Sequence, residues 1–279
     1  MGISKLLFGL RIGYPEYTAE AVDIFDKGLR EVVEGIVVCG GPFFGDLQWR
    51  LSTLPIRYGG LGLYTAKETS YYAFLASRVQ SWGLQDHILM DTGVESMDDN
   101  FHKALEALQA TLLDYDFSSF TSKDTAPLKA QSILASALFG KVVKDMDRDY
   151  ELSDRQKAVF DCLRATHAQD FLLAIPIEGL GQKMSPVEYQ SILKNRLMIP
   201  LYPSVSRCPA CFTGCLDTYG EHAVHCKVDP GFKFRHNHVR DTLYDVLWRA
   251  GISAKKEAAV KFLTNPLEGR SRRTYLWMG

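Results

Sequence analysis

The chain has 279 residues, and its 46% hydrophobic, 11% aromatic and 23% charged residues are typical of a globular protein rather than a disordered tail. No apolar run reaches the roughly 18 residues that a membrane span needs, so we expect no membrane partner. The first residues carry one lysine and a short apolar run, which does not make a secretory leader. We therefore expect an intracellular protein, nuclear or cytoplasmic.

Residues 1–90 are predicted to form helices with glycine-rich interruptions. Apolar residues recur at helical spacing over residues 18–36 and again over 65–80, where Thr65 can serve as the N-cap. Residues 54–63 contain three glycines, but no strand–loop–helix order surrounds them, so a phosphate-binding loop is not predicted. We interpret this stretch as a tight turn at a packing site.

Residues 91–203 are predicted to be mostly helical and to carry little chemistry. Periodic apolar residues predict three helices, at 101–113, 127–145 and 153–174. A further helix is predicted to begin near Ser185, because Glu188 follows it at the spacing of a capping box and Pro186 occupies the first turn.

Four of the six cysteines lie between positions 208 and 226, with two histidines among them. The best ligand set for one tetrahedral zinc ion is Cys208, Cys211, His222 and Cys226, since thiolates and imidazoles are the ligands that Zn²⁺ prefers. The two-residue gap lets one turn present two sulfurs, and His-x3-Cys places two ligands on successive turns of a short helix. We expect residues 204–230 to hold one structural zinc ion.

Other assignments of these residues exist. Cys215 and His225 are the alternatives for a place in the metal shell. Clustered cysteines can also form disulfides, but an intracellular chain usually keeps its thiols reduced. Cys39 and Cys162 stand alone, and we expect them to be small buried residues.

Positive charge is concentrated after the cluster. Residues 227–279 carry 11 Lys and Arg against 5 Asp and Glu, a net +6, so the total of −1 leaves −7 for residues 1–226. A basic C-terminal segment in an otherwise acidic chain favours DNA or RNA as the partner. The alternative is a charged surface that contacts only solvent. The side chains expected to contact nucleic acid are Arg235, His236, Arg240, Lys255 and Lys256.

Residues 231–279 are predicted to contain one helix and one strand. The helix covers residues 236–250 and ends at Gly251, and the strand covers residues 258–263. One face of the helix is apolar and consists of Val239, Leu243, Val246, Leu247 and Ala250. His236 and its neighbour His238 could equally be surface residues at the start of this helix.

Several of these passages resemble the carboxyl-terminal part of non-LTR-type retroelement reverse transcriptases. The most specific is the Cys/His cluster followed directly by Arg235-His-Asn, and the next is Leu-Pro-Ile-Arg-Tyr-Gly-Gly-Leu-Gly at residues 54–62. The remaining similar passages are residues 4–11, 196–201, 220–226 and 234–241. Together they run across almost the whole chain.

The resemblance implies a polymerase thumb at residues 1–90, a connector at 91–203, a zinc cluster at 204–230 and a truncated restriction-like endonuclease at 231–279. The fold class that follows is mainly α. A helical thumb and connector bundle would precede a small zinc-binding module and an incomplete α/β end.

The resemblance also implies that both catalytic centres are missing. Residues 96–99 are similar to the polymerase box that holds Mg²⁺, but Ser96 stands at its aromatic position and the flanks are polar. We expect a helix N-terminus there instead, where acidic residues suit the helix dipole. Glu257 is a vestigial nuclease carboxylate, and the acidic residue that family members carry after residues 269–271 is absent. Mg²⁺ is expected only for the intact parent enzyme, because such a nuclease needs two or more carboxylates around its metal.

The sequence therefore predicts a fragment of a retroelement reverse transcriptase and endonuclease that retains a zinc-stabilised nucleic-acid-binding module. The alternative is a zinc-containing protein-interaction module, in which the apolar face of residues 236–250 docks a partner helix. No nucleophile elbow and no His-Glu-x-x-His motif indicates a hydrolase, and no small-molecule substrate is evident.

Overall fold

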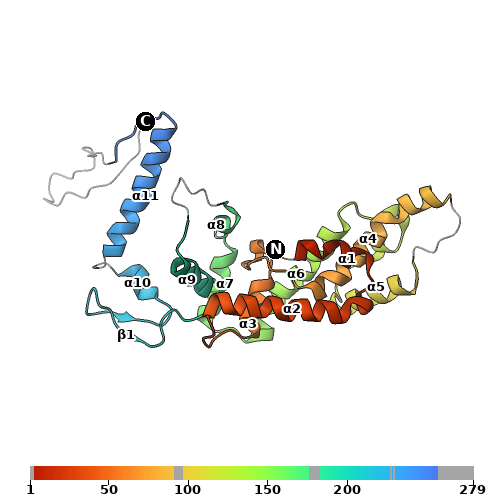
Figure 1. Cartoon of the computed structure of the whole chain (residues 1–279), viewed down its shortest axis with the longest axis horizontal. Coiled ribbons are helices and arrows are strands. Elements are labelled where there is room, and N and C mark those ends of the chain that lie inside the picture. Colours follow the sequence, from red (N-terminus) through yellow and green to blue (C-terminus); the bar gives the residue numbers. More distant parts are fainter. Residues whose placement is uncertain (1–2, 91–96, 176–182, 227, 229, 257–279) are drawn as a thin grey trace. The chain divides into compact units, whose positions relative to one another are not determined.

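The structure is a computed structural model that describes residues 3–90, 97–175, 183–226, 228 and 230–256 (Figure 1). The chain divides into two compact units, Met1–Pro200 and Leu201–Gly279. The described part is mainly helical, as the sequence predicts, and its strands form one two-stranded sheet. Helices from both sides of residue 90 pack together within the first unit.

The first unit consists of helices and short turns. Its described α-helices are α1 (Leu7–Ile12), α2 (Pro15–Val38), α3 (Asp46–Thr53), α4 (Ala66–Leu89), α5 (Asp99–Thr111), α6 (Ala130–Tyr150), α7 (Asp154–Arg164), α8 (Asp170–Leu173) and α9 (Pro186–Arg196). Its 3-10 turns are η1 (Ile3–Lys5), η2 (Ile56–Tyr58), η3 (Ser118–Phe120) and η4 (Lys123–Thr125).

Helix α4 is the centre of the first unit, because α1, α2, α5 and α6 all pack against it. It buries Tyr72, Leu75 and Trp82, which recur at helical spacing. Phe101 of α5 and Leu134 of α6 are fully buried in the same cluster. Each large apolar side chain removed from water stabilises the fold by about 1.5–3 kcal/mol, so this packing holds α4 to its neighbours.

The glycine-rich stretch is a tight turn, as the sequence predicts. The carbonyl of Leu54 accepts the backbone N–H of Gly62 at 2.9 Å. A Cβ atom at Gly60 would lie 2.0 Å from the Leu54 oxygen, so only glycine fits there. The turn is held from α9 by Arg196, whose Nη2 donates to the carbonyls of Gly59 at 3.1 Å and Gly60 at 3.4 Å.

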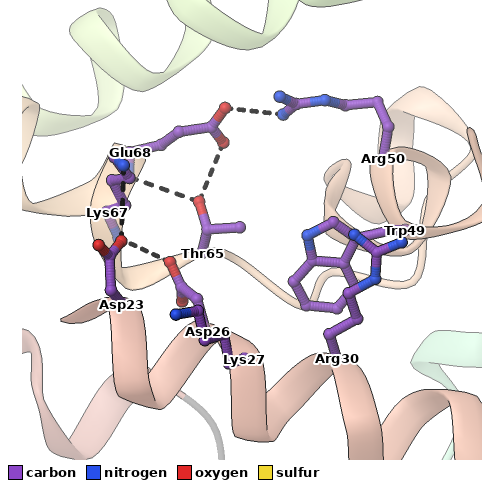
Figure 2. A pocket seen from close by; sticks show the side chains of 9 residues that line it. All are labelled: Asp23, Asp26, Lys27, Arg30, Trp49, Arg50, Thr65, Lys67 and Glu68. Atoms are coloured by element: carbon purple, nitrogen blue, oxygen red, sulfur yellow. Dashed lines mark hydrogen bonds and ion pairs between the residues drawn. The ribbon is translucent and has the colours of Figure 1, made fainter. Parts of the chain in front are cut away.

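The N-terminus of α4 is capped from another helix (Figure 2). The carboxylate of Asp26, on α2, accepts the backbone N–H groups of Ala66 at 2.6 Å and Lys67 at 3.0 Å. Thr65 accepts the N–H of Glu68 at 3.4 Å, as its predicted role as N-cap requires. Burial raises the pKa of the Asp26 carboxyl above its usual value, against the opposing effect of the two N–H groups.

Two predicted helix starts are confirmed. Ser185 and Glu188 form a capping box at α9, with Ser185 Oγ accepting the Glu188 N–H at 3.3 Å. Asp98, in the stretch that is similar to the polymerase box, accepts the Phe101 N–H at 2.9 Å and is the N-cap of α5. Asp98 also pairs with Arg78 of α4. Its carboxylate is therefore engaged in capping and pairing rather than in a metal site.

Two sequence predictions for this unit are wrong. The helix expected over residues 153–174 breaks after Arg164, and a separate short helix begins at Asp170. Between them, His167 adopts a left-handed backbone with φ of 67°, which no helix can continue through. Cys39 and Cys162 are exposed rather than buried, because Cys39 caps the C-terminus of α2 and Cys162 lies on the outer side of α7.

The second unit contains one small sheet and two helices in its described part. The strands β1 (Ser206–Arg207) and β2 (Cys215–Leu216) are antiparallel, and the helices are α10 (Glu221–His225) and α11 (Pro230–Arg249). The carbonyl of Thr218 accepts the N–H groups of Leu201 at 2.8 Å and Tyr202 at 2.9 Å. These bonds fix the start of the unit against the segment that follows β2.

Candidate metal centre

A β-hairpin presents the first two cysteines. Ser206 pairs with Leu216 and Arg207 with Cys215, so the chain turns back between them. The N–H of Cys208 donates to the carbonyl of Gly214 at 2.9 Å, and the N–H of Phe212 donates to the carbonyl of Cys208 at 3.0 Å. This turn directs the Cys208 and Cys211 thiols into one space.

Helix α10 supplies the other two side chains. His222 lies in its first turn and Cys226 directly follows its last residue. The ligand atoms of Cys208, Cys211, His222 and Cys226 all lie within 4.8 Å of one another. The structure therefore brings together the four residues that their spacing selects.

The distances fit a tetrahedral ion. Zinc bonds of about 2.0–2.3 Å place neighbouring ligand atoms roughly 3.4–3.8 Å apart. Cys208 Sγ and Cys226 Sγ are 3.9 Å apart, and Cys211 Sγ is 3.4 Å from His222 Nε2. All six cysteines are free thiols, so none of them forms the disulfides that clustered cysteines can make. Three thiols and one imidazole could thus hold a metal such as zinc.

Local hydrogen bonds favour the thiolate form of these cysteines. The Thr213 hydroxyl, then the Gly214 N–H at 3.2 Å, lower the pKa of Cys211 to about 5. Hydrogen bonding from the Cys211 backbone lowers the pKa of Cys208, and the two sulfurs in turn raise the pKa of His222. Cys208 and Cys226 are each only 3% exposed, so water is largely excluded from their sulfurs.

Two supporting residues escaped the sequence analysis. The His222 ring packs on Gly214, where a Cβ would lie 2.1 Å from His222 Cε1. The Asp217 carboxylate accepts the N–H groups of Tyr219 at 2.9 Å, Glu221 at 3.1 Å and His222 at 2.9 Å, which fixes the start of α10. The signal for Asp217 was its place just before the short helix, where acidic side chains satisfy free N–H groups.

The two alternative ligands do not join the cluster. Cys215 is exposed on β2, and its thiol is not among the ligand atoms that converge. His225 is exposed at the end of α10 and likewise lies outside the group. The geometry favours the set chosen from spacing because His222 and Cys226 share one side of the α10 turn.

The predicted nucleic-acid contacts lie on and after α11. Arg235 and His236 are in the helix, and His236 is exposed. Arg240 and Lys256 converge on one carboxylate, because Asp241 accepts from Arg240 Nη2 at 3.0 Å and from Lys256 Nζ at 3.3 Å. Lys255 is exposed. The pairing lowers the pKa of Asp241, with Arg240 as the main cause.

The apolar face of α11 is exposed. Val239 is 58% exposed, Leu243 45% and Val246 54%, and Trp248 on the same helix is 70% exposed. Within the second unit, α11 packs only lightly on α10 in the part that the structure describes. The predicted strand at 258–263 and the carboxylate of Glu257 lie outside the described residues.

Neither a family model, nor a curated protein, nor a solved structure matches this chain. Among the residues described, no helix has the length and apolarity to cross a membrane.

Proposed function

We propose that the second unit is a zinc-stabilised nucleic-acid-binding module. The observation that carries the proposal is the convergence of Cys208, Cys211, His222 and Cys226 within 4.8 Å, directly before a helix rich in basic residues. A structural zinc site of this kind supplies much of the folding free energy of a small unit, and it would fix the hairpin and α10 before α11 begins.

Charge supports nucleic acid as the partner. Residues 227–279 carry a net +6 in a chain whose total is −1. Cations near phosphates release counterions, so affinity should fall as salt rises. In the proposal, Arg235, His236 and Lys255 contact phosphates, and Arg240 and Lys256 do so when phosphate replaces their contact with Asp241.

We further propose, on the motifs quoted above, that the chain is a fragment of a non-LTR-type retroelement reverse transcriptase and endonuclease. The proposal assigns no catalytic step to this chain. Its activity would be binding of DNA or RNA, with zinc as the structural cofactor and Mg²⁺ needed only by the intact parent enzyme.

The test pairs zinc content with binding. We expect about one zinc per chain, lost in Cys208→Ser and in Cys226→Ser, and binding to labelled duplex DNA or RNA that weakens between two salt concentrations. Arg240→Gln should lower the salt slope by about one unit. Lys144→Gln, an exposed lysine of α6, is the matched control and should leave both affinity and slope unchanged. Salt-independent affinity would overturn the nucleic-acid proposal.

A second candidate is a zinc-containing protein-interaction module, and the exposed Val239, Leu243 and Val246 favour it. Exposed apolar faces often mark contact surfaces. Leu243→Ser would weaken binding of a protein partner but leave nucleic-acid affinity unchanged, whereas Arg240→Gln would do the reverse. Zinc binding without any nucleic-acid binding would favour this candidate.

A further inference from the structure

A cleft of about 890 Å³ opens in the first unit, between η1 and α1 on one side and the start of α6 on the other. Its lining includes the apolar side chains of Leu7, Ile56 and Phe139. This volume lies in the range of sites that hold small organic ligands. The metal centre belongs to the other unit, so the cleft is a separate feature of the chain.

The lining of the cleft includes three cations, Arg11, Arg57 and Lys129, and no acidic residue is among the described residues that line it. Residues 1–226, which contain the cleft, carry a net charge of −7. The positive charge of the cleft lining is therefore opposite in sign to the net charge of this part of the chain. Cations gathered without counterions raise the local potential and attract anions.

Among the described residues, the two guanidinium groups of the lining donate to neutral acceptors, and Arg57 also lies 4.8 Å from the centroid of the Tyr58 ring. Arg11 donates from Nε at 2.9 Å and Nη2 at 2.6 Å to Gln131 Oε1, and Arg57 Nη2 donates to Ser136 Oγ at 2.8 Å. Lys129 has no ion-pair partner within the described ranges. A guanidinium group donates two parallel hydrogen bonds, which fit a carboxylate or a phosphate better than a side-chain amide. Replacing these neutral contacts by an anion would therefore lower the free energy.

Other polar groups of the lining favour a ligand larger than a bare ion. Gln169 Oε1 is a buried acceptor that has no hydrogen-bond donor, and it belongs to a residue that lines the cleft. A buried acceptor left without a partner costs free energy that a ligand hydroxyl or amine would recover. Ser132 and Ser136 add hydroxyls along the same side of α6.

We infer that this cleft binds a phosphate-bearing ligand of nucleotide size. The phosphates would lie at Arg11, Arg57 and Lys129, and a donor group of the ligand would face Gln169. A free nucleotide and one residue of a single-stranded nucleic acid present the same chemistry, and the experiment must separate them.

The experiment titrates the full chain with adenosine triphosphate, with inorganic triphosphate and with a short labelled single-stranded oligonucleotide. We expect Lys129→Gln to weaken binding of the preferred probe about tenfold and the Arg11→Gln/Arg57→Gln/Lys129→Gln variant to weaken it at least a hundredfold. Lys144→Gln, in α6 but outside the cleft, should bind as the wild type does. Arg240→Gln, in the second unit, should leave adenosine triphosphate binding unchanged, which separates this inference from the function proposed above.

Preferred binding of adenosine triphosphate over inorganic triphosphate would support a nucleotide site. Binding of the oligonucleotide but not of adenosine triphosphate, weakened by the triple variant also when Arg240→Gln is already present, would support the same chemistry supplied by a nucleic-acid strand. Melting curves show whether the triple variant folds. If it does not fold, binding by Lys129→Gln tests the inference instead, because Lys129 makes no ion pair within the described ranges and its replacement removes none from the fold. Equal affinity of wild type and Lys129→Gln for every probe, or no binding of any probe, would overturn the inference.

Discussion

Gly214 supports the candidate metal centre although it supplies no ligand atom. The His222 ring occupies the space of a side chain at this position, since a Cβ would lie 2.1 Å from Cε1 and 2.6 Å from Nε2. His222 can therefore keep its place opposite Cys211 only if residue 214 has no side chain. Sequence spacing selects the four clustered side chains, but it cannot identify this neighbour.

We predict that Gly214→Ala lowers zinc affinity by about 10–100-fold while all four ligands remain, because the imidazole must move away from Cys211. Competition with a chromophoric chelator measures the affinity. Gly83→Ala is the control, because a Cβ at Gly83 meets nothing within 4 Å. Unchanged zinc affinity in Gly214→Ala would show that His222 is not a ligand.

Arg196 is a second residue whose structural role depends on the direction of its hydrogen bonds. It is 4% exposed, and besides Gly59 and Gly60 it donates to the carbonyl of Ala168 at 3.4 Å. Burial lowers the pKa of its guanidinium. The planar fork reaches three carbonyls from two segments, which a single ammonium cannot do.

We predict that Arg196→Lys lowers the free energy of unfolding of the first unit by about 1–3 kcal/mol, because it leaves buried carbonyls without donors. Urea unfolding followed by circular dichroism measures the loss. Arg148→Lys, at an exposed surface ion pair, should change stability far less, because solvent screens the pair. Equal stability of the two variants would contradict this role for Arg196.

At the scale of elements, the start of α4 depends on α2. Asp26 accepts two N–H groups there, while Asp23 makes only a 3.5 Å contact with the Lys67 ammonium at the surface. Because burial raises the pKa of Asp26, its ionised form is disfavoured in the folded state. The oxygen acceptor, rather than the charge, is then the stabilising feature.

We predict that Asp26→Ala costs about 1 kcal/mol of stability, that Asp26→Asn costs less, and that Asp23→Ala costs the least. The pH dependence has a definite sign. The pKa of Asp26 in the folded state lies above its usual value of 3.8, so between these two pKa values the native state binds more protons than the unfolded state. The wild type therefore loses stability relative to Asp26→Asn as pH rises through the range between the two pKa values. Unfolding titrations across this range measure the difference, and a gain in relative stability would contradict the sign.

The helix α11 allows a second test at this scale. Asp241 neutralises Arg240 and Lys256, two of the cations that we assign to phosphate contacts. We predict that Asp241→Asn strengthens nucleic-acid binding several-fold and steepens its salt dependence, because both cations lose this carboxylate. Asp245→Asn is the control, since it removes the same charge from the same helix without an ion pair to either cation. Equal gains in both variants would indicate general charge rather than Asp241.

At the scale of the whole molecule, the two compact units draw their stability from different sources. The first has two extended apolar cores, around Trp82 and around Leu51. The second leaves Val239, Leu243 and Trp248 exposed in its described part, so it buries little apolar surface there. Because small units with little apolar core are often stabilised by a metal, we expect a metal at the Cys/His cluster to contribute to the folding of this unit.

We predict that a zinc chelator unfolds the second unit and leaves the first folded. Limited proteolysis should then cut within residues 201–256 and spare 3–90, and the melting transition of the first unit should not shift. Cys211→Ser should behave as chelated wild type does, while Cys215→Ser, which lies outside the cluster, should behave as untreated wild type. Loss of both units together would contradict independent stabilisation.

The sequence by itself determined the features that depend on neighbours a few residues apart. Helical periodicity located α2, α4, α5 and α6, the capping spacing located the start of α9, and the Cys-x2-Cys and His-x3-Cys spacings selected the four clustered side chains. It failed at residues 165–169, where a left-handed residue interrupts an otherwise periodic stretch.

Only the tertiary structure decided contacts between distant segments. It joined Arg196 to Gly59 across 137 residues and Asp26 to the start of α4 across 40, placed the His222 ring on Gly214, and gathered Arg11, Arg57 and Lys129 around one cleft. Periodicity and spacing record local geometry alone. Which distant side chains meet depends on how the helices pack, and that packing is fixed by the burial of the whole core.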